Sequence, residues 1–180
     1  STFRFNTNLN RSFNNANNNT KGSKNVTETG TNNTLIMGES NTVKGFSRNN
    51  IIVGSNNEIA NGVNNANVFG TFGEATANNS VVLGGNAGSD ALGKRQSIRL
   101  LYGLQTTDGS NTSSFLNNTT DSLFAIPINT IMYFHADVVA VRVGGSAAGN
   151  LGDYGSWVER GVIINENGTV SINRERDTIK

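Results

Sequence analysis

Short apolar runs bounded by Asn and Gly recur along the first half of the chain at a nearly fixed interval. Segment 32–45, NNTLIMGESNTVKG, and segment 49–62, NNIIVGSNNEIANG, share one order: Asn pair, apolar run, Gly, polar stretch, apolar residue, Gly. The Gly residues that end successive apolar runs are separated by 16, 16 and 14 residues, and they are Gly38, Gly54, Gly70 and Gly84. Self-similarity at a fixed period predicts a stack of similar coils.

Each apolar run is too short to form a helix. The runs hold three or four residues, favour β-branched types and are closed by Asn and Gly, so a short strand between turns fits them better. Asn and Gly also adopt the left-handed backbone conformations that tight corners need. We therefore expect each repeat to form one coil of a β-solenoid or β-roll. A degenerate earlier coil is indicated by Gly22, which is in phase, and by segment 24–30, KNVTETG.

Both faces of the short strands are apolar. Because alternate residues of a strand point to opposite faces, Leu35 and Met37 face one way and Ile36 the other. One face can fill the coil, but the other would form an exposed apolar stripe, which soluble monomers avoid. We expect copies of the same chain to cover it in a parallel bundle. The candidate packing residues, taken from both faces, are Ile36, Ile52, Val68, Val82, Met37, Val53, Phe69 and Leu83.

The pattern changes after the linker-like segment 84–96. Longer stretches then alternate apolar and polar residues, and within 123–143 Phe134 and His135 fall on opposite faces of an expected strand. Segment 165–168, Asn-Glu-Asn-Gly, predicts a hairpin turn between two further strands. About 85 residues with several such strands can form a small antiparallel β-sandwich.

Composition supports an all-β chain of short strands and tight turns. Of 180 residues, only 35% are apolar and 15% charged, while there are 21 Gly and about thirty Asn. Asn at solenoid corners tolerates turns, which is the interpretation we favour. The alternative is that stacked Asn amides present hydrogen-bonding ladders to sugars.

Charge, cysteine content and the length of the apolar runs argue against several kinds of site and partner. A net charge of +1 gives no basis for attraction to nucleic acid or anionic membrane, and without Cys there are no disulfides or thiolate sites. The apolar runs are far shorter than a membrane span. The polar N-terminus, STFRFNTNLNRSF, has no apolar region of a secretory signal. We therefore expect neither membrane insertion nor export by a signal peptide.

Few residues are candidates for catalysis. His135 is the only His and has no Ser or Asp placed to complete a triad. Glu58 and Glu74 each fall four residues after a repeat Gly, so they should stack on adjacent coils. Paired carboxylates can hydrolyse glycosidic bonds when about 5–9.5 Å apart, but the equivalent residue of the preceding coil is Thr42. We interpret the pair as solvated carboxylates, and we expect no enzyme activity, metal or cofactor.

The repeats resemble the head repeats of trimeric autotransporter adhesins. The matching segments are 32–45 and 49–62, and the resemblance extends over about residues 30 to 90. That family forms a left-handed β-roll with three chains packed around one axis, and similar repeats occur in bacteriophage fibres. The chain departs from the family's usual Ala-Thr-Gly ending, with Val43-Lys44-Gly45 in one copy. The resemblance implies a homotrimer.

The second half resembles a C-terminal module of phage tail and virion structural proteins. The resemblance rests on TTDGSNTSSF, IPINTIMYFHADVVAVRV and SWVERGVIINENGTVSI, and covers residues 96–180. In that module further strands normally follow the hairpin, whereas this chain stops at Lys180. The resemblance implies a virion structural protein. It also implies that the C-terminal domain is either truncated here or receives its last strands in another way.

These observations lead to one expected organisation. Residues 1–30 would be an attachment or lead-in segment, 31–90 a trimeric β-roll shaft, and 91–180 an antiparallel β domain. We expect a homotrimeric tail or head fibre of a phage virion, assembled in the bacterial cytoplasm. Its expected partners are copies of itself, other tail or capsid proteins, and a glycan or protein of the host surface. The alternatives are a fragment of a bacterial trimeric adhesin and a tailspike that depolymerises polysaccharide.

Overall fold

The chain forms two compact all-β units. The computed structural model describes residues 11–12, 17–85, 91–107, 112–145 and 149–179. The first unit comprises Ser1–Gly103 with Phe115–Ser122, and the second comprises Leu104–Ser114 with Leu123–Lys180. The described residues contain strands and turns without helix, and hence no helix that could cross a membrane. The all-β prediction is confirmed.

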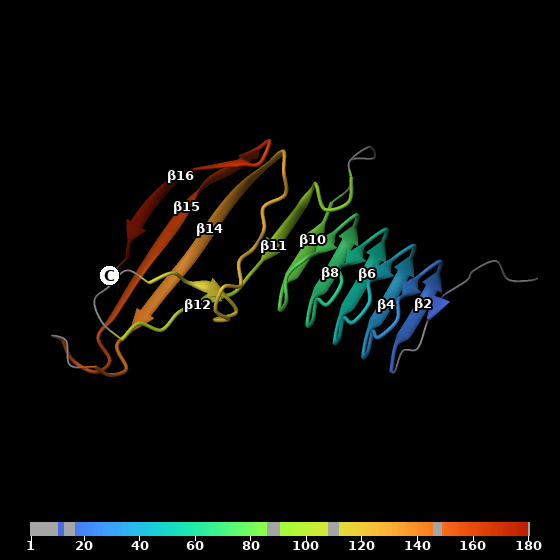
Figure 1. Cartoon of the computed structure of the whole chain (residues 1–180), viewed down its shortest axis with the longest axis horizontal. Coiled ribbons are helices and arrows are strands. Elements are labelled where there is room, and N and C mark those ends of the chain that lie inside the picture. Colours follow the sequence, from blue (N-terminus) through green and yellow to red (C-terminus); the bar gives the residue numbers. More distant parts are fainter. Residues whose placement is uncertain (1–10, 13–16, 86–90, 108–111, 146–148, 180) are drawn as a thin grey trace, which may run out of the picture. The chain divides into compact units, whose positions relative to one another are not determined.

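The first unit is a β-solenoid in which one long strand of each coil pairs with the next. Equivalent residues lie side by side in parallel register, as Gly22 with Gly38 and Gly38 with Gly54, and Figure 1 shows the strands as successive arrows. The long strands are β2 (Asn19–Ser23), β4 (Leu35–Glu39), β6 (Ile51–Ser55), β8 (Asn67–Thr71) and β10 (Val81–Gly84). The predicted repeat of about 16 residues is confirmed, and so is the early coil marked by Gly22.

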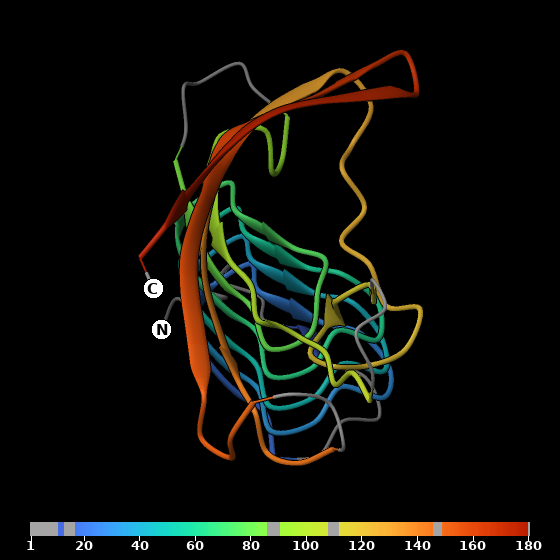
Figure 2. The ribbon, with the colours of Figure 1, turned by 90° about the vertical axis from the view of Figure 1, so that its left-hand side faces the viewer.

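A second parallel sheet of short strands closes the other side of the coils. Its strands are β1 (Arg11–Ser12), β3 (Val26–Thr27), β5 (Thr42–Val43), β7 (Glu58–Ile59) and β9 (Glu74–Ala75). A further row of parallel bridges joins Asn32, Arg48 and Asn64. Figure 2 looks along the stack, so that the coils of this unit lie one behind another. The three coils that begin with β2, β4 and β6 therefore each have a long strand, a short strand and a bridged segment.

The solenoid interior is a narrow apolar core. The long strands contribute one residue per coil and the short strands another, and both rows are fully buried. The rows are Ile36, Ile52, Val68 and Val82 from the long strands, and Val43, Ile59 and Ala75 from the short ones. The alternation of side chains along each strand places these residues inside because their neighbours on either side point outward.

A ladder of buried Asn side chains accompanies the core. Asn41 donates from Nδ2 to Oδ1 of Asn25 at 3.0 Å and to the carbonyl of Gly54 at 2.8 Å. Asn57 repeats the arrangement one coil later, on Asn41 at 3.1 Å and Gly70 at 2.8 Å. The ladder satisfies polar backbone groups that the coil would otherwise bury without partners.

A second, exposed Asn ladder runs along one corner of the coils. Its members are Asn33, Asn49, Asn65 and Asn79, all with positive φ between 51° and 56°. Each amide nitrogen lies 2.9–3.2 Å from the side-chain oxygen of the next Asn. The interpretation of Asn as a corner residue is therefore confirmed. Within each of the two ladders, the amide of one Asn hydrogen-bonds to the amide of the Asn in the next coil.

The last coil is closed by an antiparallel strand and one side chain. Strand β11 (Gln96–Arg99) pairs antiparallel with β10, and Ile98 packs against the core. The Gln96 side chain accepts from the Glu74 backbone nitrogen at 2.7 Å and donates to the Glu74 carbonyl at 3.1 Å. It thus occupies the place of a further strand beside β9. Strands β12 (Tyr102–Gly103) and β13 (Phe115–Leu116) form a short antiparallel pair in the same unit.

The second unit is built on one antiparallel sheet. Its strands, in order, are β14 (Thr130–Val141), β15 (Tyr154–Glu166) and β16 (Thr169–Thr178). The predicted hairpin is confirmed: Glu166 pairs with Thr169, and Asn167 and Gly168 turn the chain with φ of 52° and 89°. Among the described residues of this unit there is a single sheet rather than the two layers of a sandwich.

The compact units divide the chain differently from the expected ranges 1–30, 31–90 and 91–180. The coils already begin within the range assigned to an attachment segment, since β1 pairs with β3 and the first long strand starts at Asn19. Strands β11 to β13, which follow residue 91, belong to the first unit, and β11 closes its last coil by pairing with β10. Residues 1–10 and 13–16, on which much of the expected attachment segment falls, lie outside the described residues.

Candidate interaction face of the coil stack

The outward side of the long-strand sheet carries an apolar surface, which we call the stripe. Parallel pairing places equivalent residues beside one another, so that Met37 lies next to Val53 and Val53 next to Phe69. The stripe consists of two rows: Leu35, Ile51 and Val81, interrupted by Asn67, and Met37, Val53, Phe69 and Leu83.

Half of the predicted packing residues belong to this stripe. Met37 is 41% exposed, Val53 and Phe69 are 37% exposed, and Leu83 is 56% exposed. These side chains are held by strands whose inner residues are anchored in the core, so they form a surface of fixed spacing.

The other four predicted packing residues are corrected by the structure. They are Ile36, Ile52, Val68 and Val82, each 0% exposed. They pack inside the coil of their own chain and therefore cannot contact a second chain while the solenoid is folded. The sequence could not separate the two sets because both faces of each strand are apolar.

An exposed basic residue lies at each end of the stripe. At one end Lys21 of β2 lies beside Met37, and at the other end Arg99 of β11 lies beside Val81. Between them the stripe contains no charged residue. An apolar surface without charges, interrupted by a single Asn, is typical of the centre of a protein interface.

The stacked glutamates lie on a different side, on the short-strand sheet. Glu58 and Glu74 occupy equivalent positions of β7 and β9, as predicted, with Thr42 in the preceding coil. Lys44 Nζ lies 3.6 Å from Glu58 Oε2 and 3.6 Å from Glu28 Oε1. Burial raises the pKa of Glu74, the charge of Glu58 raises it further, and Lys94 opposes them. Glu58 is thus held in an ion-pair row, while Glu74 is partly desolvated beside it.

The second unit holds the remaining charged clusters. His135 Nε2 lies 3.3 Å from Asp137 Oδ1 on the exposed side of β14, an ordinary strand pair. On β15, Arg160 lies 3.3 Å from Glu175 and 3.0 Å from Asp177 of β16, and the hydrogen bond to Glu175 raises the pKa of Arg160.

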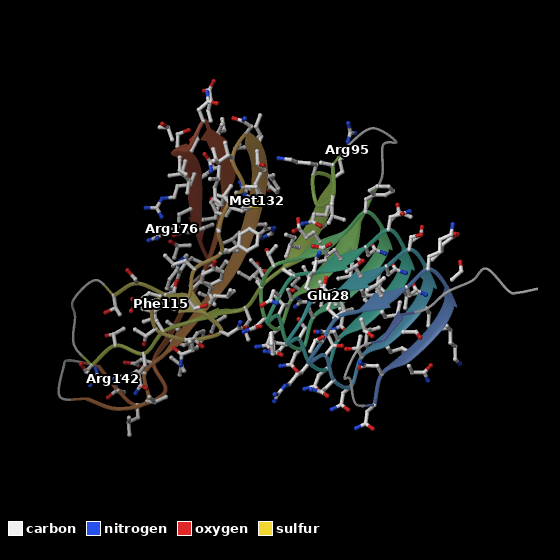
Figure 3. The ribbon with its side chains drawn as sticks, turned by 45° about the vertical axis from the view of Figure 1, so that its right-hand side comes forward. Glu28, Arg95, Phe115, Met132, Arg142 and Arg176 are labelled. Atoms are coloured by element: carbon white, nitrogen blue, oxygen red, sulfur yellow. The ribbon has the colours of Figure 1, made fainter. Side chains whose placement is uncertain are left out.

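A second ion-pair group of this sheet is centred on Glu159. Arg174 and Arg176 both contact the Glu159 carboxylate. Arg176, labelled in Figure 3, also lies over the Trp157 ring at 5.7 Å from its centroid. These groups neutralise one another, and nowhere in the described ranges do three or more His, Asp or Glu residues converge as metal ligands.

Sequence reasoning missed two features that position the stripe. The buried ladder has a signal in the sequence, since Asn25, Asn41 and Asn57 recur at the 16-residue interval. The Gln96 side chain that closes the stack has none, because its partners lie 22 residues away in the chain. Comparison of the chain with protein-family models, with curated proteins and with solved structures finds no match.

Proposed function

We propose that this chain is a structural fibre protein of a virion: a homotrimeric tail or head fibre of a bacteriophage that contributes to attachment to the host surface. The observation that carries the proposal is the exposed apolar stripe along a solenoid of regular coils. A surface repeated at each coil can be matched continuously by a parallel copy of itself, and soluble proteins rarely leave such surfaces bare.

The number of chains comes from the resemblance of segments 32–45 and 49–62 to the head repeats of trimeric autotransporter adhesins. Three stripes facing a common axis would bury one another and leave the short-strand sheets outside. The resemblance of residues 96–180 to a module of phage tail proteins supports a virion rather than a bacterial surface, with assembly in the bacterial cytoplasm. The role is mechanical and adhesive, without a catalytic step, nucleic-acid binding or membrane insertion.

The mass of the full chain in solution tests this proposal. Light scattering over a range of concentrations should give a stable mass of about three chains, or 3 × 19.1 kDa. A clean monomer at every concentration would overturn it, because the stripe would then be stable in water without a partner.

A fragment of a bacterial trimeric adhesin would share the trimeric shaft and give the same mass. The discriminating observation is the set of neighbouring genes: capsid and tail genes support the virion, and their absence favours the adhesin.

A polysaccharide-cleaving tailspike remains the second candidate because of one observation. Burial and the charge of the stacked Glu58 raise the pKa of Glu74, and a carboxyl group with a raised pKa beside a second carboxylate is what acid-catalysed hydrolysis of a glycosidic bond uses. Incubation of the protein with host polysaccharide, alongside Glu58→Gln and Glu74→Gln, tests it. Cleavage that both substitutions abolish would support a tailspike, and no cleavage by the unsubstituted protein would exclude it.

A further inference from the structure

Phe46 is an exposed aromatic residue in a backbone conformation that normally belongs to Gly. Its φ is +60°, and its side chain is 68% exposed. The equivalent turn residues of the neighbouring coils are Gly30 and Gly62, with φ of +83° and +72°. A bulky side chain with positive φ is strained, so this coil keeps a ring where its neighbours have none.

Burial does not compensate for the strain at Phe46. Phe72 provides the contrast, because it also has a positive φ, of 55°, but is only partly exposed. Phe72 also belongs to a row in which every coil has a residue other than Gly, namely Lys24, Ser40, Asn56 and Phe72. A strained residue that stays largely exposed is a candidate for function.

The glycines on either side make the ring accessible. A Cβ on Gly30 would lie 2.9 Å from Phe46 Cδ1, so the ring rests against the bare backbone of Gly30. On the other side, a Cβ on Gly62 would meet no atom within 4 Å. The ring is therefore supported from one coil and open toward the next, as a flat apolar platform.

Hydrogen-bonding groups lie at Gly45, the residue before Phe46. The backbone nitrogen of Gly45 donates to Glu28 Oε2 at 3.1 Å, which brings that carboxylate to the turn; Figure 3 labels Glu28 on the coil stack. The amide nitrogen of Asn61 also lies at the turn, 3.4 Å from the position of a Cβ on Gly45. Arg48 follows two residues after Phe46 and is exposed. An acceptor and a donor thus lie at the residue next to Phe46, and a further donor follows two residues after it.

The platform lies apart from the stripe. Phe46 belongs to the turn between the short strand β5 and the bridge at Arg48, whereas the stripe lies on the outward face of the long strands. Chains that associate through the stripe would leave this turn in solvent. A single exposed ring is also too small an apolar area for a protein interface.

We propose that Phe46 and its surrounding groups form a carbohydrate-binding site. A pyranose can place the apolar face of its ring on Phe46, while its hydroxyls donate to Glu28 and accept from Asn61 and Arg48. A nucleobase would also stack on Phe46, but the Glu28 carboxylate at the same turn and the net charge of +1 do not favour an attached phosphate. The site deepens the proposed attachment function and rests on it, since it names the class of host-surface ligand.

The experiment uses the full chain and a printed array of bacterial O-antigen and capsular polysaccharides. The unsubstituted protein should bind at least one glycan, and Phe46→Gly should weaken that binding about tenfold or more. Phe46→Tyr, which keeps the ring, should restore binding. Tyr102→Ala is the matched control, since it removes an exposed aromatic residue elsewhere in the same unit and should leave binding unchanged.

A thermal melt separates binding from structure. Phe46→Gly should have a Tm equal to or above that of the unsubstituted protein, because Gly relieves the strain as it does at Gly30 and Gly62. A clear fall in Tm would show that the ring is structural and would overturn the proposal, as would an array with no bound glycan or unchanged binding by Phe46→Gly.

Light scattering on the same samples keeps this inference separate from the fibre proposal. A monomer that binds glycan through Phe46 would remove the fibre and keep the site. A trimer whose binding does not depend on Phe46 would keep the fibre and remove the site.

Discussion

Asn41 and Asn25 are stacked inside the coil, with the Asn41 amide nitrogen 3.0 Å and its backbone nitrogen 3.1 Å from the same oxygen, Oδ1 of Asn25. The Asn41 oxygen in turn accepts from the backbone and side-chain nitrogens of Asn57 at 3.0 and 3.1 Å. One side chain therefore links three coils. Both Asn25 and Asn41 are 0% exposed, so water cannot replace these bonds.

Replacement of Asn41 by Ala should destabilise the solenoid strongly. The substitution leaves the buried nitrogens of Asn57 and the carbonyl of Gly54 without this partner, and each unsatisfied buried group costs about 1–3 kcal/mol. We expect a loss of roughly 3 kcal/mol in the free energy of unfolding, measured by urea denaturation. The exposed Asn61→Ala is the control and should change it by no more than about 0.5 kcal/mol. Equal effects of the two substitutions would contradict the structural role of the ladder.

The repeat Gly residues are required by close approach between coils as well as by their backbone conformation. A Cβ on Gly54, which has a φ of +138°, would lie 1.8 Å from the carbonyl oxygen of Gly70. No side-chain movement can relieve a clash with backbone, so Gly54→Ala should prevent normal stacking and cost more than about 4 kcal/mol. Gly62→Ala is a matched comparison: its φ is +72° but the space is open, so it should cost about 1–2 kcal/mol. Thermal melts of both variants test this order, and a smaller loss for Gly54→Ala would refute it.

Much of the fold could be predicted because the sequence repeat itself indicates which residues of neighbouring strands pair. Once Gly38 and Gly54 are equivalent, the parallel register of the strands that contain them follows, and the structure has that register from Leu35 with Ile51 to Glu39 with Ser55. The hairpin was equally predictable, since Asn167-Gly168 is a turn that needs two positive φ angles.

The sequence predicted that coils form, but it did not show which residues face the inside of each coil. Ile36 and Met37 are both apolar, and alternation alone does not say which of them faces inward. Asn41 and Asn49 are the same residue type, yet one is buried in the ladder and the other exposed at a corner. Gln96 acts through a contact with Glu74, 22 residues away, which no local pattern encodes. In each case tertiary packing, rather than local preference, decides the role.

Glu74 should make the stability of the solenoid depend on pH. Its pKa in the folded state is raised, first by burial and then by Glu58, against the attraction of Lys94. The folded protein therefore binds this proton more tightly than the unfolded chain does, so stability decreases as the pH rises from the unfolded to the folded pKa. Glu74→Gln, which is neutral at every pH, should raise Tm at about pH 7 and give little difference at about pH 3, where the Glu74 carboxyl is protonated in both states.

The control for that titration is Glu39→Gln. Glu39 is exposed and lies 3.2 Å from Lys24, so its substitution should leave Tm unchanged or slightly lower near neutral pH. A Tm of Glu74→Gln below that of the unsubstituted protein near neutral pH would mean that ionised Glu74 stabilises the coil, contrary to the direction of its pKa.

A charge in the stripe should separate the chains without unfolding them. Val53 lies between Met37 and Phe69 at the middle of the stripe and is 37% exposed, while its neighbour Ile52 is fully buried. Val53→Lys can keep its ammonium in water in a lone chain but would bury it in an association through the stripe, at a cost of several kcal/mol. We expect the mass by light scattering to fall from about three chains to one, with the β-sheet circular dichroism retained. Thr29→Lys introduces the same charge at an exposed turn on another side of the coil and should leave the mass unchanged. If Val53→Lys keeps the mass of the unsubstituted protein, the chains associate through another surface, because a charge in the centre of an apolar contact could not be tolerated.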